Sequence, residues 1–538
     1  MLCLWLPAAD GSAGERDLAE AMADHLACYP VELLSFKEQN PSIVREDVCL
    51  AVIYHESGAE PLWVSEDGPG MRAGIILKYL KNAGNEGLDP DDYQVETIAD
   101  LWTDPNLESL AKLDTLLTYN MVKYVHDVSY GQLKPYIVNP ELFAEAGERG
   151  FDPLAMIETI LATENLDAFF QSLPPHHRQY RGLRKGLLHY GRLKYSGQWQ
   201  MLSDSKSIRP GDEDERIVAI RKRIALLENA SMEDSKTGNS SVYDDTLLEK
   251  VVLFQQNHGL YQDGILGRNT IRELNISPED RLTQIKVNMA RWRWQDHSLG
   301  DKYILVNIAN YRLYTYAAGE LEFSLPVIVG KFQHQTPVFS DRIKYLELNP
   351  YWNVPPSIAR NEDLPELRKN PNYLVEKNIR LFSNWQEDGV ELDSTVIDWG
   401  RVSPTEMARF KLRQDPGPTN ALGRVKFVFP NRYAVYLHDT PAKNLFSEQK
   451  RSFSHGCIRV SEPEKLAVFL LDAEGSEWNS ARVNDLINLG KRTVLKIHPP
   501  IHVHITYQTA WVDKDDQIIF NGDVYGRDEK LYKALFIK

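Results

Sequence analysis

Cys457 stands apart from the other three cysteines, which all fall within the first fifty residues, and it lies in the stretch RSFSHGCIRV. His455 is two residues before it, and His438 closes the alternating run YAVYLH further upstream. A thiol is mostly un-ionised near neutral pH, so a cysteine nucleophile needs an imidazole or another activating group close by. Gly456 lacks a side chain, and its N–H, with that of Cys457, could point at a developing oxyanion. These residues predict a Cys/His acyl-transfer site; the alternative is a buried structural cysteine beside two unrelated histidines.

The sequence after Cys457 predicts a helix that begins almost at once. SEPE has a capping-box pattern, with Ser461 as the N-cap and Glu464 three residues later, and KLAVFLL follows as an amphipathic run. The N-terminus of a helix carries partial positive charge. Together with a nearby imidazole, that charge would favour a thiolate at Cys457.

The composition is typical of a multidomain globular protein. A chain of 538 residues has room for several domains, and 43% apolar with 25% charged residues fits a folded protein. The formal net charge of -15 repels phosphate backbones, and no large basic patch offsets it. We therefore expect no nucleic-acid partner.

The cysteines and the N-terminus bear on the compartment. Cys3, Cys28 and Cys49 form no C-x-x-C pair, so a zinc site is not expected, and Cys28 and Cys49 either pair in an oxidising compartment or remain two buried thiols. No apolar run is long enough to span a membrane. Residues 1–40 begin like the end of an export signal without its basic leader, so any membrane tether would come through such a signal. A disordered or packed N-terminus is the alternative.

Residues 41–209 predict a helical scaffold domain. In LESLAKLDTLLTYNMVKYVHDVSYG the apolar residues Leu110, Leu113, Leu117 and Met121 recur at helical spacing, and Gly131 ends the run. FDPLAMIETILATENLDAFFQSL follows the same pattern. Nothing in this region demands chemistry.

Residues 210–278 predict a smaller unit of helices joined by a polar loop and a glycine-bearing turn. The string FQQNHGLYQDGILGRNTIRELN resembles the peptidoglycan-binding domain, a three-helix module, with Gly259, Gly264 and Gly267 at its turns. The resemblance implies peptidoglycan as a ligand; a module that serves only as a spacer is the alternative. Residues 279–301 continue as a linker helix whose RWRW string we interpret as the end of a packed helix.

From about residue 302 the apolar period changes from that of helices to that of strands. YILVNIAN, YRLYTY, LEFSLPVIVG, IKYLELN and RVKFVFP are short β-branched or alternating runs. They predict a β-rich domain over 302–500 with an insertion at 355–422, then a C-terminal β-hairpin and tail over 501–538. His502 and His504 share a strand face but lack an acidic or cysteine partner, so no metal site is expected. The fold class is multidomain α+β.

The spacing around Cys457 resembles the catalytic motif of the L,D-transpeptidases of the YkuD fold. The matching residues are His438, Ser454, His455, Gly456, Cys457, Ile458 and Arg459. The strings VGKFQHQTPVF, LNPYWNVPPSIA and DPGPTNALGRVKFVFPN extend the likeness over most of the β-rich half. With the helical scaffold and the peptidoglycan-like module, the order of domains resembles the large periplasmic members of Gram-negative bacteria.

The resemblance implies a role for each residue. Cys457 is the nucleophile, His438 is the general base, and the backbone carbonyl of Asp439 orients the imidazole. His455 and Gly456 shape the oxyanion pocket.

The resemblance also assigns Asp439 and two further residues to substrate binding. They are Arg459, which would hold a peptide carboxylate or brace the loop, and Ser454. The family often has Gly or Ser in place of Asp439 and Asn in place of Arg459, so the roles of these two residues are the ones in question.

The reaction implied is acyl transfer between peptidoglycan stem peptides, with a donor tetrapeptide, a cysteine thioester, release of D-alanine and a 3-3 cross-link to an acceptor stem. It needs no cofactor or metal, carbapenems would react with the same thiol, and the insertion would act as a lid. Other cell-wall enzymes are expected as partners in the periplasm. A carboxypeptidase, an enzyme that attaches a protein to peptidoglycan, and a non-catalytic wall-binding protein are the alternatives; a papain-like protease is disfavoured because there the cysteine precedes the histidine.

Overall fold

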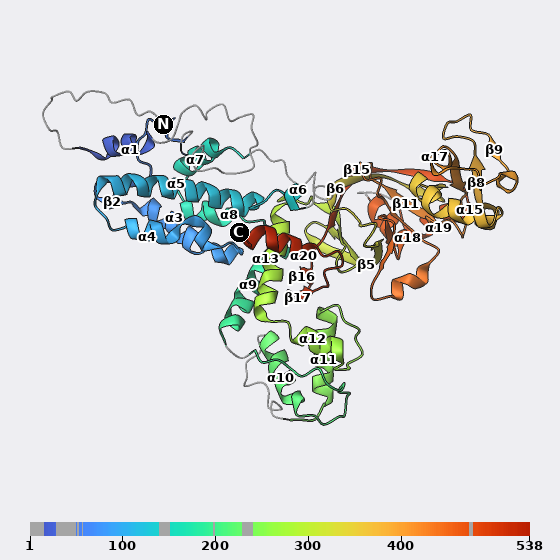
Figure 1. The fold of residues 1–538 in the computed structure, drawn as a ribbon, viewed down its shortest axis with the longest axis horizontal. Helices are drawn as coiled ribbons and strands as arrows, with labels where there is room; N and C mark the ends of the chain where they lie inside the picture. Colours follow the sequence, from blue (N-terminus) through green and yellow to red (C-terminus); the bar gives the residue numbers. More distant parts are fainter. Residues whose placement is uncertain are drawn as a thin grey trace.

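The computed structural model describes residues 16–27, 50, 53–55, 57–138, 151–196, 199–228, 240–472 and 477–537. Cys3, Cys28, Cys49 and the apolar N-terminal run lie outside the described residues. Figure 1 shows a helical part, a small three-helix unit and a β-rich part arranged around the helices α9 (Arg178–Tyr195), α13 (Pro278–Arg293) and α20 (Arg527–Phe536). In the described part of the chain, no helix has the length and apolar character needed to cross a membrane.

The helical scaffold is built on α5, which runs from Leu107 to Tyr130. The side chain of Asn106 caps its start. Gly131, with φ of 91°, ends it, as the sequence predicted. The FDPLAMIETILATENLDAFFQSL segment is two helices, because the Asn165 side chain caps a second start. The other elements are α1 (Leu18–Leu26), β1 (Val64–Ser65), β2 (Gly68–Pro69), α3 (Met71–Lys81), η2 (Ala83–Glu86), η3 (Pro90–Tyr93), α4 (Val95–Leu101), α6 (Pro135–Val138), α7 (Pro153–Ala162) and α8 (Leu166–Ser172).

Asp114, on the buried face of α5, ties the β1 segment to the scaffold core. Its carboxylate accepts hydrogen bonds from the N–H groups of Leu62 (3.1 Å), Trp63 (2.7 Å) and Val64 (3.1 Å). The Tyr54 hydroxyl donates to it at 2.5 Å. Burial raises the pKa of Asp114, and these hydrogen bonds oppose that shift. One carboxylate therefore satisfies several buried donors at once.

The three-helix unit contains α10 (Arg216–Leu227), α11 (Asp245–Asn257) and α12 (Arg268–Leu274), as predicted. Its core also includes Leu202 and Ile208, so the unit begins before residue 210. Gly259 and Gly264 have φ of 61° and 65° and lie at turns, where glycine is favoured. Gly267, with φ of -85°, lies at the start of the third helix as the N-cap of α12.

The β-rich domain is a nine-stranded sheet with the order β13-β5-β14-β12-β11-β6-β15-β3-β4, and β4 also pairs with β5, so the sheet closes on itself. Its core is aliphatic and aromatic. The strands are β3 (Lys302–Asn307), β4 (Arg312–Ala317), β5 (Glu320–Gly330), β6 (Phe339–Leu348), β11 (Val425–Val428), β12 (Leu437–His438), β13 (Ser452–Ser454), β14 (Ile458–Val460) and β15 (Thr493–Thr506). The helices α18 (Pro463–Leu471) and α19 (Ser480–Asn488) precede β15. The predicted boundary at 500/501 is wrong, since it cuts through β15, which pairs with β6 on both sides of that point and with β3 after it.

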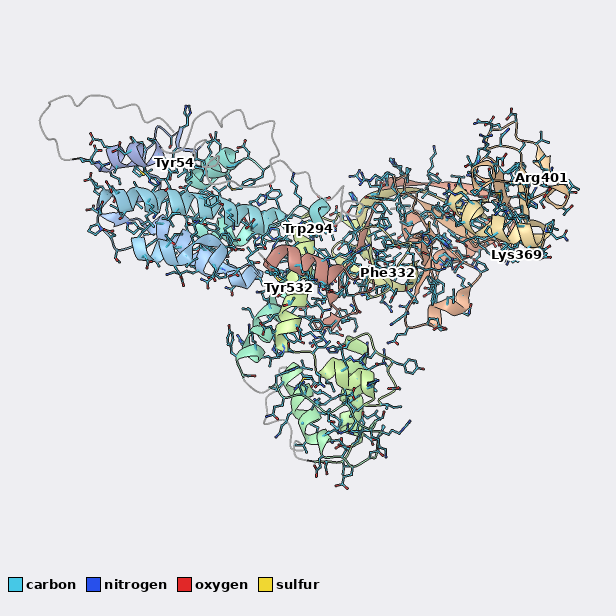
Figure 2. The ribbon with its side chains drawn as sticks, viewed as in Figure 1. Tyr54, Trp294, Phe332, Lys369, Arg401 and Tyr532 are labelled. Carbon is cyan, nitrogen blue, oxygen red and sulfur yellow. The ribbon has the colours of Figure 1, made fainter. Side chains whose placement is uncertain are left out.

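The insertion at 355–422 is a folded unit with its own core. Its four-stranded sheet has the order β7-β10-β8-β9, and the core includes Val354, Leu367, Leu381 and Leu412. It forms the outer end of the β-rich part, where Figure 2 labels Lys369 and Arg401. The elements are β7 (Trp352–Asn353), α14 (Pro356–Ile358), η5 (Ala359–Asp363), α15 (Leu364–Lys369), α16 (Tyr373–Glu376), β8 (Ile379–Phe382), β9 (Glu391–Leu392), η6 (Ser394–Val396), α17 (Pro404–Met407) and β10 (Lys411–Gln414).

The C-terminal segment contains the predicted hairpin, β16 (Ala510–Val512) and β17 (Ile518–Phe520). The remainder, expected to be a tail, forms α20 and packs on α13. Arg291, Trp292 and Arg293 are buried at the end of α13, which confirms that the RWRW string ends a packed helix. Residues 279–301 are therefore a central packing element rather than a linker.

We expect Asp114→Ala to destabilise the scaffold by about 3 kcal/mol, because it leaves buried N–H donors without an acceptor. Hydrogen exchange of the α5 amides, measured by mass spectrometry, checks this result. Asp100→Ala, at an exposed position in α4, is the matched control and should change protection little. Equal protection of α5 in the two variants would contradict the role of Asp114.

Candidate active site

Strand pairing places three cationic or titratable side chains in one row. Lys426 of β11 lies opposite His438 of β12, and His438 lies opposite Arg459 of β14. Directly paired residues on neighbouring strands share a face of the sheet. Cys457 and Tyr436 each lie two residues before a member of this row, and the Ile458 N–H donates to the Tyr436 carbonyl at 3.1 Å. The expected nucleophile and base therefore lie on one face of adjacent strands.

His438 is buried, with 5% of its surface exposed, and its orientation is set by the main chain. Its Nδ1 is 2.5 Å from the Asp439 carbonyl oxygen, the contact expected for Asp439. A carbonyl only accepts, so Nδ1 carries the proton and Nε2 of the neutral ring can accept one. Burial, followed by the charge of Arg459, lowers the pKa of His438 to about 3. The imidazole is therefore neutral at physiological pH.

The Asp439 side chain has a structural role. This role was in question because the family often has Gly or Ser at this position. It accepts from the Arg424 N–H at 2.8 Å, and Lys443 Nζ contacts it at 2.5 Å. A Cβ at Gly423, whose φ is 60°, would collide with the Asp439 carboxylate. The carboxylate thus holds the turn that presents the carbonyl to His438, and it is 4% exposed rather than turned toward a substrate.

Cys457 is half-buried, and strand β14 rather than a helix follows it. The predicted capping box is wrong: α18 begins at Pro463, its N-cap is Glu462, and no side chain caps it. Pairing of β14 with β12 and β5 takes the residues after Cys457 into the sheet. The start of α18 is therefore separated from Cys457 by β14 and does not directly follow the thiol, as the sequence had suggested.

The positive charge near Cys457 comes from side chains. Burial raises the pKa of the Cys457 thiol, while hydrogen bonds from Tyr436 and the charges of Lys426 and Arg459 oppose that shift. The pKa shifts of Cys457 and His438 thus both favour the neutral form of the side chain over a thiolate–imidazolium pair.

Ser454 braces the cysteine loop, which we define as residues 454–457. Its hydroxyl donates to the Cys457 carbonyl at 2.5 Å and accepts from the Gly456 N–H at 3.1 Å. Ser454 is 2% exposed, so the structure does not support the predicted contact with substrate. The Gly456 N–H is likewise occupied and is not the oxyanion donor that we expected. Among the described residues none accepts from the Cys457 N–H, which leaves that group as the candidate donor.

His455 faces the insertion. Its Nε2 lies 2.5 Å from an oxygen of Glu362 in η5, and its ring is 4.9 Å from that of His334. The insertion therefore contacts the cysteine loop directly. The sequence could not identify Glu362, which is far from His455 in the chain and stands in a polar segment.

Arg459 and Lys426 are the two positively charged side chains in the row that contains His438. Arg459 is half-buried, and within the described part of the chain its Nε has no hydrogen-bond partner. Lys426 Nζ lies 4.2 Å from the centre of the Tyr436 ring, and the row continues to Glu347, which pairs with Arg492 at 2.8 Å. Lys426 and Tyr436 were missed in the sequence analysis. Lys426 is the single lysine within the predicted strand RVKFVFP, and Tyr436 is on the same strand face as His438, so their positions in these strands could have indicated them.

The histidines of β15 lie away from this site. His504 Nδ1 is 2.8 Å from Ser340 Oγ, and Nε2 is 3.0 Å from the Leu299 carbonyl oxygen. The part of the chain that the structure describes contains no group of three His, Cys, Asp or Glu placed to hold a metal ion.

Comparison with known families divides the chain as the structure does. Residues 301–484 match the YkuD family, described as "L,D-transpeptidase catalytic domain". The chain carries an L,D-transpeptidase catalytic domain of the YkuD family. Residues 49–187 match a "Scaffold domain", and residues 214–274 match a "Putative peptidoglycan binding domain".

Individual relatives are less complete matches. A protein of Haemophilus influenzae named "Putative L,D-transpeptidase" is 33% identical over 301 residues, which are 55% of this chain and 58% of the relative. Among solved structures, an L,D-transpeptidase from Mycobacterium smegmatis (14% identity, TM-score 0.19, covering 38% of this chain and 58% of that one) and L,D-transpeptidase 3 from Mycobacterium tuberculosis (14%, 0.19, 38% and 61%) are similar. The chain spans little more than half the length of the curated relative.

We expect alkylation of Cys457 by iodoacetamide to show no inflection between about pH 5 and 8, where an ordinary imidazole titrates. The lowered pKa of His438 keeps the ring neutral there, and the raised pKa of Cys457 moves ionisation to more alkaline pH. The rate, followed by peptide mass spectrometry, should rise only in the alkaline range. A plateau beginning near neutral pH would instead indicate an ion pair in the resting catalytic domain.

Replacement of Lys426 by glutamine should raise the pKa of the Cys457 thiol further, because a positive charge that favours the thiolate is lost. The pH dependence of alkylation measures this shift. Lys344→Gln, at an exposed position of β6, is the matched control and should leave the profile unchanged. Identical profiles for both variants would show that Lys426 does not act on the thiol.

Proposed function

We propose that the protein is a peptidoglycan L,D-transpeptidase that forms 3-3 cross-links through a thioester on Cys457. The observation that carries the proposal is the row of Lys426, His438 and Arg459, with Cys457 beside it, within a catalytic domain of this family. A peptidoglycan stem supplies an amide carbonyl for the thiol and a terminal carboxylate for the cations.

The acylation step follows from the neutral resting state. His438 Nε2 takes the thiol proton as sulfur attacks the amide carbonyl, so charge separates only during the attack. The Cys457 N–H donates to the oxyanion. When the C–N bond breaks, the imidazolium returns its proton to the departing amine of D-alanine, and a thioester remains.

The second step reverses these proton movements. The acceptor amine loses its proton to His438 as it attacks the thioester carbonyl, and the new amide forms as the C–S bond breaks. The thiolate then regains the proton. Water in place of the amine would release a tripeptide, so carboxypeptidase activity is the alternative at the same site.

Arg459 and Lys426 are proposed to bind the donor carboxylate. Both are half-buried in the described structure and lie in the row that contains His438. A charge-assisted contact is stronger in such a desolvated site than in water. This proposal extends the expected carboxylate role of Arg459 to a pair of cations.

The remaining parts of the chain suggest where the reaction occurs. We propose that the three-helix unit holds the enzyme on peptidoglycan in the periplasm, and that the scaffold serves other cell-wall enzymes. The insertion would cover the donor stem and exclude water, which favours the amine acceptor over hydrolysis. The contact between Glu362 and His455 supports this lid role, since it joins the insertion to the cysteine loop.

Incubation with a carbapenem should give one covalent adduct by intact-protein mass spectrometry, and Cys457→Ala should abolish it. His438→Ala should slow adduct formation by about 100-fold or more, because the general base is lost. Variants in which Cys28 or Cys49 is replaced by serine are matched controls and should acylate normally. An adduct that persists in Cys457→Ala would overturn the proposal.

Product analysis with a disaccharide-tetrapeptide distinguishes the two activities. A cross-linked dimer with loss of D-alanine is expected, whereas a tripeptide as the dominant product would indicate a carboxypeptidase.

A further inference from the structure

Thr336 connects the end of β5 to the cysteine loop. Its side chain is fully buried, and its hydroxyl donates to the Gly456 carbonyl at 2.9 Å while it accepts from the Gly330 N–H at 2.9 Å. The Gly456 carbonyl and the Cys457 N–H belong to one planar trans peptide, in which the two groups point in opposite directions. A hydrogen bond that fixes the carbonyl therefore also fixes the direction of the Cys457 N–H.

Tyr525 holds the other side of the 331–336 loop. Its phenol donates to the Gly330 carbonyl at 2.6 Å and accepts from the Thr336 N–H at 3.3 Å. Arg527 donates to Gln335 Oε1 at 2.9 Å and to the Thr336 carbonyl at 3.2 Å. Both side chains are buried, so these bonds form in a region that excludes water and holds them in place.

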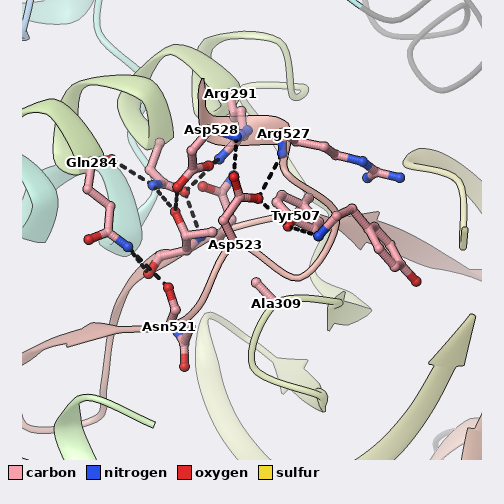
Figure 3. Close-up of polar contacts among 12 residues, drawn as sticks. Gln284, Arg291, Ala309, Tyr507, Asn521, Asp523, Arg527 and Asp528 are labelled. Carbon is pink, nitrogen blue, oxygen red and sulfur yellow. Dashed lines mark hydrogen bonds and ion pairs between the residues drawn. The ribbon is translucent and has the colours of Figure 1, made fainter. Parts of the chain in front are cut away.

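The segment that carries Tyr525 and Arg527 is anchored in turn, as Figure 3 shows for Asp523, Arg527 and Tyr507. The Tyr507 hydroxyl accepts from the Tyr525 N–H at 2.8 Å and donates to Asp523 at 2.5 Å. Asp523 also accepts from the Arg527 N–H at 2.8 Å.

The next contact reaches the central helix of the molecule. Asp528 pairs with Arg291 of α13 at 2.6 Å and accepts from Thr509 at 2.6 Å (Figure 3). A continuous set of buried and partly buried hydrogen bonds and ion pairs thus runs from α13 through residues 523–528 to the 331–336 loop and the cysteine loop.

We propose that Thr336, held by Tyr525 and Arg527, is a positioning residue that aims the Cys457 N–H at the oxyanion. Tyr525 and Arg527 lie outside the residues 301–484 that match the catalytic domain, so the C-terminal segment is a working part of the active site. The inference rests on the proposed acyl-transfer function. The positioning role of Thr336 is specific to reaction steps in which an oxyanion develops. This specificity distinguishes the role from a general effect of Thr336 on folding.

Two reactions of the same thiol provide the test. Acylation by a carbapenem passes through a tetrahedral oxyanion, whereas alkylation by iodoacetamide does not. Thr336→Val keeps the shape but removes the hydroxyl, and we expect it to slow acylation by about 100-fold, the effect of losing alignment of one oxyanion donor. Alkylation should stay within about twofold, and Thr336→Ser, which restores the hydroxyl, should recover most of the acylation rate.

The C-terminal brace is tested separately. Tyr525→Phe removes the hydroxyl group that hydrogen-bonds to Gly330 and Thr336. We expect acylation to slow by about tenfold, with the rate of alkylation unchanged. Tyr532→Phe in α20, the tyrosine labelled in Figure 2, is the matched control and should acylate at the wild-type rate.

The outcomes separate this proposal from the function on which it rests. If the wild-type protein forms no adduct, the transpeptidase proposal fails. If the wild type acylates but Thr336→Val does so equally fast, or if alkylation falls in parallel with acylation, the positioning role is overturned. If Thr336→Val does not fold, as judged by circular dichroism, the Tyr525→Phe variant decides the question. A wild-type acylation rate in folded Tyr525→Phe would then overturn the proposal that Tyr525 holds Thr336 in position.

Discussion

The parallel pairing of β12 with β14 is the constraint on which the active site depends. It joins Leu437 to Ile458 and His438 to Arg459, and so brings the histidine beside the strand that directly follows the cysteine loop. Parallel neighbours need a crossover connection between them. Here residues 439–457 form that connection and end in the cysteine loop, so the pairing that completes the sheet also places the Cys457 thiol.

The electrostatics of the site follow from this placement. Burial opposes charge on both reacting groups, as it lowers the pKa of His438 and raises that of Cys457. Lys426 and Arg459 favour the thiolate but disfavour the imidazolium, so they do not create a resting ion pair. They are instead suited to stabilise the negative charge of a substrate carboxylate or of a tetrahedral intermediate. With a neutral thiol at rest, no thiolate competes for these two positive charges.

Elements outside the central sheet also reach the cysteine loop. The insertion does so through Glu362, and the C-terminal segment does so through Tyr525 and Thr336. α13 packs against α9 and α20, and Arg291 joins it to the C-terminal segment. The catalytic centre is therefore supported by parts of the chain that are distant in sequence, and its geometry depends on how the whole protein is assembled.

Local patterns in the sequence were enough to predict most elements and to single out the candidate catalytic residues. α5 and the strands β3, β4, β5, β6 and β11 follow from periodicity, and the motif around Cys457 depends on residue types and spacing that stand close together. The capping box at Ser461 failed because a short local signal competed with strand pairing of Ile458, and pairing prevailed. Lys426, Glu362, Thr336 and Tyr525 became visible only in the tertiary structure, since strand register and buried hydrogen bonds join segments that no local window contains.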